Sequence, residues 1–247
     1  MSVVDEPRKL GLIPSPPRDL KRRLMLANYA AALPDPPPVV NGYRRLTRFP
    51  KFGNDQYGDC GFASASQLRQ VWTFNDADTP DVLNSDADTI RAYLAYTGGR
   101  DDGSVLTEVL KLWQHSGICG QRIEGYVGVD PNDHREIQQA IAIFGGLYTG
   151  FTLPAGWFDD MSHWTLANSH TRMIGGHSVA ICSYDQRQRT YGVYTWGKIV
   201  PMDFDALPQF FTELYAVLAG DWYGPDGICP NGLDVKALRE DLEAIGR

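Results

Sequence analysis

The sequence lacks the features that define several classes of protein. No apolar run approaches the length of a membrane span, and the N-terminus does not have the charged-then-apolar layout of a signal peptide. The four cysteines are too few and too scattered for a disulfide framework, and no CxxC or clustered His/Cys pattern indicates a zinc site. No internal repeat is present. We therefore expect a soluble protein made in the cytoplasm, with free thiols, no metal or other cofactor and no membrane contact.

What remains is the composition of an ordinary globular protein. Its 247 residues, 43% hydrophobic and 21% charged, are enough for one large domain or for two lobes that share a cleft. Helical patterns lie mostly before residue 145 and strand patterns mostly after it, which indicates an α+β architecture. Ser85 and Ser104 are expected to cap the helices that follow them. The expected helices cover residues 61–72, 86–96, 104–115, 130–144, 204–212 and 233–245. The expected strands cover residues 121–129, 147–153, 178–184, 191–196 and 214–218.

Basic residues and prolines are concentrated at the N-terminus. Residues 1–49 hold nine Lys/Arg against four acids, whereas the rest of the chain has 14 basic and 26 acidic side chains, for a net charge of −7. Nine of the sixteen prolines lie in the first fifty residues, where they favour extended backbone around a short helix at 18–30. We therefore divide the chain into an N-terminal arm, residues 1–49, and a folded domain, residues 50–247. The arm is expected to lie on the acidic body. Nucleic-acid binding is disfavoured, because the basic patch lacks interleaved aromatics.

The most distinctive stretch runs from residue 53 to residue 72. Its first half, GNDQYGDC, has the glycine, asparagine and aspartate content of a turn, and its second half has the apolar spacing of a helix. Cys60 therefore lies where a loop becomes the first turn of a helix, a position that favours a thiolate. The polar, glycine-rich approach predicts an exposed and reactive cysteine rather than a small buried one.

A nucleophilic cysteine needs a base, and His177 is the best candidate. It follows a glycine pair and opens a β-rich apolar run, MIGGHSVAICSYD, over residues 173–185. A cysteine that opens a helix, a later Gly-His at a strand start, and a strand ending in TWG at 195–197 resemble the papain-like cysteine peptidases. The segments 98–118 and 137–151 resemble the intervening helix and core strand of that family. The Gly-Asn-Asp-x-Tyr-Gly-Asp-Cys motif further resembles uncharacterised bacterial and phage proteins.

The resemblance implies a papain-like fold, with a helical lobe that carries the central cysteine helix and packs against an antiparallel β-sheet lobe. It also implies a thiol hydrolase that cleaves a peptide or amide bond, with Cys60 as nucleophile and His177 as base. In that family the oxyanion hole combines the backbone N–H of the cysteine with an upstream side-chain amide. Spacing favours Asn54 for this amide and residue type favours Gln56. Amidase or transglutaminase-like chemistry would use the same pair.

The group that orients the histidine is where the sequence departs from the family pattern. Tyr194 stands at the place of the usual asparagine, and a tyrosine is too long to mimic it without a shifted backbone. Thr195 is the alternative, because its hydroxyl can bond to His177. Trp196 is expected to shield the pair from water and, with Gly176, to contact substrate.

Two classes of function follow from these observations. The first is a papain-like thiol hydrolase that acts on a peptide or protein substrate. The second is a papain-fold structural or docking component of a phage particle, with a vestigial or accessory active site. In that second case the arm, residues 1–49, would contact neighbouring subunits, and the protein would be located in the virion.

Overall fold

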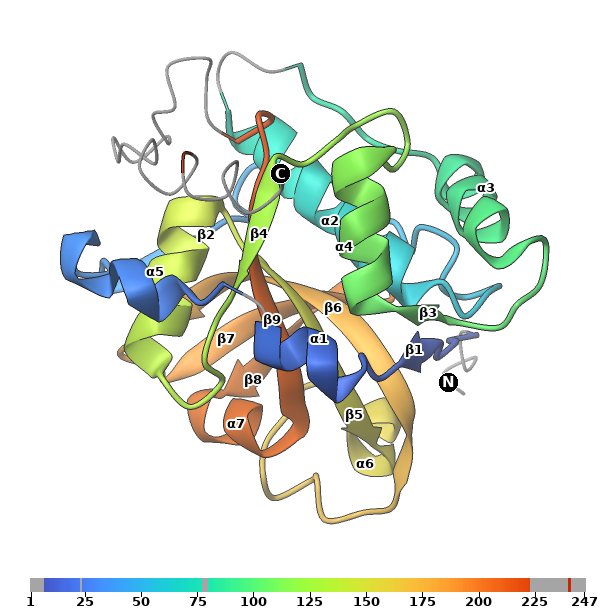
Figure 1. The fold of residues 1–247 in the computed structure, drawn as a ribbon. Coiled ribbons are helices and arrows are strands. Elements are labelled where there is room, and N and C mark those ends of the chain that lie inside the picture. The colour runs from blue at the N-terminus through green and yellow to red at the C-terminus, as the bar shows by residue number, and fades with distance from the viewer. Residues whose placement is uncertain (1–6, 23, 77–79, 223–239, 241–247) are drawn as a thin grey trace.

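The structure is a computed structural model that describes residues 7–22, 24–76, 80–222 and 240 (Figure 1). Helices α2, α3 and α4 lie together on one side, and strands β5 to β9 form a curled sheet on the other. The helices are α1 (Pro17–Arg22), η1 (Leu26–Ala32), α2 (Cys60–Asn75), α3 (Asp86–Thr97), α4 (Leu106–His115), α5 (His134–Phe144), α6 (Ala155–Asp159), η2 (Phe204–Ala206) and α7 (Leu207–Phe210). The strands are β1 (Leu12–Ile13), β2 (Val39–Asn41), β3 (Ser104–Val105), β4 (Gly125–Gly128), β5 (Leu147–Pro154), β6 (Met173–Asp185), β7 (Thr190–Thr195), β8 (Lys198–Asp203) and β9 (Phe211–Leu218). The helix expected over 233–245 lies outside the described residues, except for residue 240.

Helix α2 is the element on which the two halves meet. Thirteen of its sixteen residues are buried, and its small side chains allow strand β6 to approach closely. The hydroxyls of Ser64 on α2 and Ser178 on β6 are 2.7 Å apart. Further along α2, the Trp72 ring stacks on Trp113 of α4, with ring centroids 5.8 Å apart. Because α2 is packed on several sides, the position of its first residue, Cys60, is fixed by the core.

The two helices after α2 differ in how they begin. Ser85 caps α3 as predicted, in a reciprocal capping box with Asp88. The prediction that Ser104 caps the next helix is wrong, because α4 starts at Leu106 and has no side-chain cap. Ser104 instead belongs to strand β3, whose partner is strand β1 of the N-terminal arm. This partner is far away in the sequence, so the local pattern gave no sign of it.

The sheet is built around the thirteen-residue strand β6, which pairs antiparallel with β5 and β7. Strand β8 was not expected from the sequence. It forms because Trp196 and Gly197 both adopt positive φ and turn the chain back along β7. The helix expected over 204–212 is shorter than predicted, since the chain becomes strand β9 at Phe211. Residues 154–176, for which the sequence predicted neither helix nor strand, contain helix α6 and the start of β6.

The arm is not confined to the surface of the molecule. Its Leu12 pairs in parallel with Ser104 of β3 and antiparallel with Gly176 of β6, so β1 lies between the helical and sheet parts. Strand β2 pairs with the far end of β6, and η1 packs on α5 (Figure 1, blue). Four of its apolar side chains belong to the core: Leu12, Leu26, Tyr43 and Leu46. The arm therefore contributes to the packing of the domain.

Candidate active site

Cys60 is the first residue of α2, and its side chain is 0% exposed. Burial raises the pKa of its thiol from 9.0 to about 12, although the backbone N–H groups of Ser178, Gly11 and Gly61 oppose this shift. The sequence-based prediction of an exposed thiol in the thiolate form is therefore wrong for this structure. The reason is that the arm lies over the helix start, with the backbone of Gly11 beside the sulfur.

His177 lies on strand β6 and is 1% exposed. Its ring stacks on the indole of Trp196, with centroids 4.0 Å apart and planes 8° apart, and meets the edge of Phe151 at 5.8 Å. Its Nε2 lies 2.7 Å from the Thr195 hydroxyl. Burial lowers the pKa of His177 from 6.5 to about 3, so the imidazole is neutral at physiological pH. Trp196 shields the ring from water, as the sequence led us to expect of it.

The remaining nitrogen of His177 is free. Nδ1 is buried and has no hydrogen-bond partner in the described part of the chain. The next residue, Ser178, directs its backbone N–H toward the Cys60 sulfur. The thiol and the imidazole thus belong to one buried region, at the point where α2 meets β6, although no hydrogen bond joins them within the described ranges. The arrangement is that of a thiol and an imidazole held apart in a closed part of the core.

The two sequence candidates for an oxyanion donor are placed differently. Gln56 is exposed, while Asn54 is 2% exposed. The Asn54 amide donates to the Tyr57 carbonyl at 3.1 Å and lies close enough to the Asp59 carboxyl to oppose a rise in its pKa. Asn54 is therefore engaged within the turn before Cys60. The backbone N–H of Cys60 at the start of α2 is the other donor that the resemblance implies.

Asp59 is a feature whose importance the sequence did not reveal. It is 0% exposed, does not cap α2, and neither carboxyl oxygen has a hydrogen-bond partner among the described residues. Burial, with smaller contributions from the charges of Asp101 and Asp86, raises its pKa from 3.8 to about 8. The carboxyl next to Cys60 is consequently protonated at neutral pH, so it places no negative charge beside the thiol.

Tyr194 and Thr195 face opposite sides of strand β7, as consecutive residues of a strand do. The Tyr194 hydroxyl donates to the Pro50 carbonyl at 3.1 Å and lies 3.2 Å from the Gln70 side chain. Only Thr195 of the pair reaches His177. Of the two sequence candidates for the orienting group, the structure therefore brings Thr195 to the imidazole and places Tyr194 elsewhere in the core.

Residues 8–12 of the arm run across this region in extended form. Lys9 donates its N–H to the Asn54 carbonyl at 2.9 Å and accepts from the Trp196 indole at 3.3 Å. The Gly11 carbonyl accepts from the Ser104 N–H at 2.7 Å. A Cβ on Gly176 would lie 2.3 Å from the Leu12 carbonyl, so this expected substrate-contacting glycine contacts the arm instead. The segment therefore hydrogen-bonds to the helical part of the molecule, through Asn54 and Ser104, and to the sheet part, through Trp196. Cys60 and His177 are buried beneath it.

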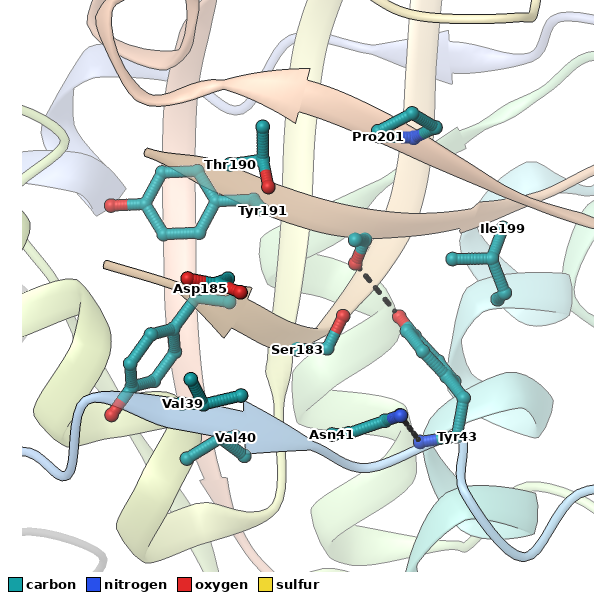
Figure 2. A pocket seen from close by; sticks show the side chains of 12 residues that line it. Val39, Val40, Asn41, Tyr43, Ser183, Asp185, Thr190, Tyr191, Ile199 and Pro201 are labelled. Carbon is teal, nitrogen blue, oxygen red and sulfur yellow. Dashed lines mark hydrogen bonds between the residues drawn. The ribbon is translucent and has the colours of Figure 1, made fainter. Parts of the chain in front are cut away.

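A groove of about 410 Å³ lies elsewhere on the molecule (Figure 2). It is lined by residues of strands β2, β6, β7 and β8. Tyr43, at one end, donates its hydroxyl to the Gly192 carbonyl at 2.9 Å. Neither Cys60 nor His177 lines this groove.

No group of three or more His, Cys, Asp or Glu in the described ranges could hold a metal ion, and no helix there is long and apolar enough to cross a membrane.

Comparison with known proteins identifies the fold. No protein-family model and no curated protein matches the sequence. Among solved structures, xylellain, a cysteine protease from Xylella fastidiosa, is similar with a TM-score of 0.68 and 15% identity, covering 88% of this chain and 99% of its own. The cysteine protease and lectin-like domains of Cwp84, a surface layer associated protein of Clostridium difficile, give 0.57 at 13% identity and coverages of 85% and 55%. ProCathepsin B S9 from Trypanosoma congolense gives 0.54 at 9% identity and coverages of 85% and 82%. The fold is thus papain-like, as expected from the sequence.

Proposed function

We propose that this protein is a papain-like cysteine peptidase, or a closely related thiol hydrolase, that cleaves a peptide or amide bond. Cys60 is the nucleophile, His177 the general base and Thr195 the group that orients the base. The observation that carries the proposal is the different environment of the two His177 ring nitrogens. Its Nε2 is bonded to the Thr195 hydroxyl, while its Nδ1 is buried, unpaired and adjacent to the residue whose N–H approaches the Cys60 sulfur.

The chemistry follows from these positions once a substrate replaces the arm. His177 Nδ1 takes the proton of the Cys60 thiol, and the thiolate attacks the carbonyl carbon of the scissile bond. The backbone N–H of Cys60 donates to the oxyanion, aided by the helix start. His177 then gives the proton to the leaving amine, which leaves a thioester on Cys60. Water, deprotonated by His177, hydrolyses this thioester and restores the thiol.

Thr195 has a specific part in this cycle. Its hydroxyl accepts the Nε2 proton of His177, which selects the tautomer whose Nδ1 lone pair can receive the thiol proton. Asn54 is proposed as the second oxyanion donor. Its amide would have to exchange the Tyr57 carbonyl for the substrate oxygen, and both lie at the same turn before Cys60.

The arm, residues 1–49, is proposed to be a prosegment-like cover for the domain formed by residues 50–247. Its support is the set of hydrogen bonds that join Lys9 to Asn54 and Trp196 and Gly11 to Ser104, and the complete burial of Cys60 beneath them. Burial is also the cause of the unreactive protonation states of the thiol and the imidazole. Displacement of residues 8–12 would hydrate both groups and move their pKa values toward ordinary ones.

The alternative is a structural component of a phage particle, to which the Gly-Asn-Asp-x-Tyr-Gly-Asp-Cys motif relates the chain. One observation favours it: in the full chain the thiol and the imidazole are both neutral and inaccessible. In that role the arm would leave the cleft to bind a neighbouring subunit, and the Cys60–His177 pair would perform no turnover.

A single substitution in the full chain tests the proposal. A Cβ at Gly11 would lie 1.7 Å from the Gly58 carbonyl oxygen, so Gly11→Val should force the arm out of the cleft while leaving residues such as Leu26 in the core. Ile13→Val is the matched control, because Ile13 is 44% exposed on the same strand. We expect Gly11→Val to hydrolyse a mixed fluorogenic peptide pool and the control to resemble the unaltered chain. Absence of turnover in Gly11→Val, with its fold intact by circular dichroism, would favour the assembly role.

A further inference from the structure

A buried acid beside the proposed nucleophile has no part in the chemistry described above. Asp59 is the N-cap residue of helix α2, yet its side chain makes no capping hydrogen bond to the helix. An aspartate at this position ordinarily accepts a backbone N–H of the first helical turn. Here it is 0% exposed, and both carboxyl oxygens lack a partner among the described residues. The carboxyl therefore lacks the usual capping bond, a departure from a local rule that is common at functional sites.

The Asp59 carboxyl lies between the turn before α2 and helix α3. A Cβ on Gly53 would lie 2.7 Å from Oδ2 of Asp59 and 2.5 Å from the Ile90 side chain, so the absence of a side chain at Gly53 makes room for the acid. The groups that shift the pKa of this carboxyl most belong to the turn, to α3 and to the loop after α3, and not to the arm. Asp59 therefore stays buried when the arm leaves the cleft.

The side chain that faces this carboxyl is Asn54, the proposed second oxyanion donor. Its amide donates to the Tyr57 carbonyl at 3.1 Å, and its proximity lowers the pKa of Asp59 more than that of any other group does. A primary amide has two hydrogens to donate. Asn54 thus lies between two acceptors, the Tyr57 carbonyl and the Asp59 carboxyl, and it can reach a substrate oxygen only if neither acceptor holds it strongly.

The surroundings of Asp59 favour its uncharged form. Asp101, in the loop after α3, accepts the Gly58 N–H at 2.8 Å and the Tyr93 hydroxyl at 2.7 Å, which fixes a second acid close by. Asp86, at the start of α3, is a third. The other titratable groups at the turn are the ion pair of Lys51 with Asp55, the exposed Lys9 and the Cys60 thiol. Burial together with the neighbouring acids therefore opposes a charge on Asp59 at neutral pH.

We propose that Asp59 is a positioning residue for the oxyanion site, which as a neutral acid leaves the Asn54 amide to the substrate oxygen and as a carboxylate withdraws it. The proposal rests on the proposed function, since it assigns a further residue to that same reaction. Hydrogen bonds to a carboxylate are about twice as strong as those to a neutral group. Ionisation of Asp59 therefore moves the amide from the cleft to the buried acid. Hydrolysis should then fall as pH rises through about 8, because the developing oxyanion loses a donor.

The test uses the full chain with Gly11→Val and a fluorogenic peptide that has no titrating group between about pH 6 and pH 9.5. In this parent protein kcat/KM should be about tenfold lower at pH 9 than at pH 6.5, which is the ratio given by a single ionisation near pH 8. Asp59→Asn cannot ionise, so the same ratio should be about twofold or less. Asp55→Asn is the matched control, because this acid of the same turn pairs with Lys51, and it should keep the tenfold fall.

A second measurement separates positioning of the amide from a direct effect of charge on the thiol. Alkylation of Cys60 by iodoacetamide forms no oxyanion and needs no donor for one. Asp59→Asn should therefore change the alkylation rate at pH 9 by about threefold or less relative to the parent protein, while it raises kcat/KM there by about tenfold. An equal rise in both rates would show that Asp59 acts on the thiol alone, and it would overturn the proposal.

The remaining outcomes bear on different claims. A parent profile without the alkaline fall, or a fall that survives Asp59→Asn, would overturn the role of Asp59 and leave the proposed function standing. No hydrolysis at any pH, together with no labelling of Cys60 by a peptidyl vinyl sulfone, would overturn the proposed function and this inference with it. If Asp59→Asn fails to fold, Asp59→Ser gives the same comparison with a smaller neutral side chain.

Discussion

The Thr195 hydroxyl lies 2.7 Å from Nε2 of His177, on a strand where its neighbour Tyr194 faces the other way. A hydroxyl in this position has the property the chemistry needs, which is a lone pair aimed at the ring N–H. It differs from a carboxylate in that it adds no charge to stabilise an imidazolium. We therefore expect the pair to depend on orientation by Thr195 more than on electrostatic activation by it.

Replacing Thr195 tests this dependence. Thr195→Val removes the acceptor and leaves the Nε2 proton of His177 buried without a partner, so kcat/KM in the Gly11→Val background should fall by about 10- to 100-fold. The unfolding free energy should fall by about 1–3 kcal/mol. Thr195→Ser keeps the hydroxyl and should recover most of the activity. Steady-state kinetics and urea unfolding measure the two effects, and equal activity of the valine and serine variants would contradict the assigned role.

Tyr194 provides the contrasting substitution. Tyr194→Phe removes the hydroxyl that donates to the Pro50 carbonyl. This hydroxyl makes no hydrogen bond to His177 in the described part of the chain. It should lower the unfolding free energy by about 0.5–1.5 kcal/mol and leave kcat/KM in the Gly11→Val background nearly unchanged. A loss of activity as large as that of Thr195→Val would return Tyr194 to the position of orienting residue.

The closed cleft predicts an order of thiol reactivity. Cys60 and Cys182 are fully buried with pKa values raised to about 12, whereas Cys119 is partly exposed. In the unaltered chain, iodoacetamide at neutral pH should modify Cys119 before Cys60. In Gly11→Val the rate at Cys60 should rise by about tenfold or more, because hydration lowers its pKa. Peptide mapping by mass spectrometry gives each rate, and rapid modification of Cys60 in the unaltered chain would contradict the account of the arm.

Asp59 gives a prediction for stability against pH. Its pKa is raised from 3.8 to about 8 in the folded chain, so the folded state holds a proton that the unfolded state releases as pH rises. The favourable contribution is complete below about pH 4 and is lost as pH rises through about 8. Asp59→Asn removes this titration, so its unfolding free energy relative to the unaltered chain should increase by about 1–3 kcal/mol between pH 5 and 8.

Chemical denaturation at several pH values measures that difference. Subtracting the two proteins cancels the titration of other groups, such as Glu136, whose pKa is also raised by burial, to about 7. A difference that stays constant from pH 5 to pH 8 would show that the Asp59 carboxyl is not held protonated in the fold.

The sequence indicated the candidate residues that lie in a recognisable local pattern. Cys60 and His177 stand at a helix start and in a Gly-His strand opening, and these features can be recognised without knowledge of distant contacts. Whether Tyr194 or Thr195 contacts His177 could not be decided from the sequence, because it depends on how strand β7 is oriented in the sheet. The family resemblance only aligned Tyr194 with the usual asparagine. The packing of β7 in the sheet determines that the Thr195 side chain, and not that of Tyr194, contacts His177.

The closed state of the site could not be predicted in the same way. It depends on the pairing of Leu12 with Gly176 and Ser104, which are both distant from Leu12 in the sequence. Proline content indicated extended backbone in the arm, yet the apolar residues that anchor it are too widely spaced to form a pattern. Glu213, which accepts the N–H of Ser15 in the arm at 3.0 Å, did carry a signal, as a single acid within the apolar strand FTELYAVL, and a buried acid in such a strand requires a partner.

The central claim is that Cys60 and His177 form a working pair that the arm covers. A peptidyl vinyl sulfone, followed by mass spectrometry of the modified residue, tests it most directly on four full-length proteins: the unaltered chain, Gly11→Val, Gly11→Val with His177→Ala, and Ile13→Val. We expect labelling of Cys60 to be fast in Gly11→Val, slow in the unaltered chain and Ile13→Val, and about 100-fold slower in Gly11→Val when His177 is removed. A rate at Cys60 that does not depend on His177, or faster labelling of another cysteine than of Cys60 in Gly11→Val, would contradict the claim.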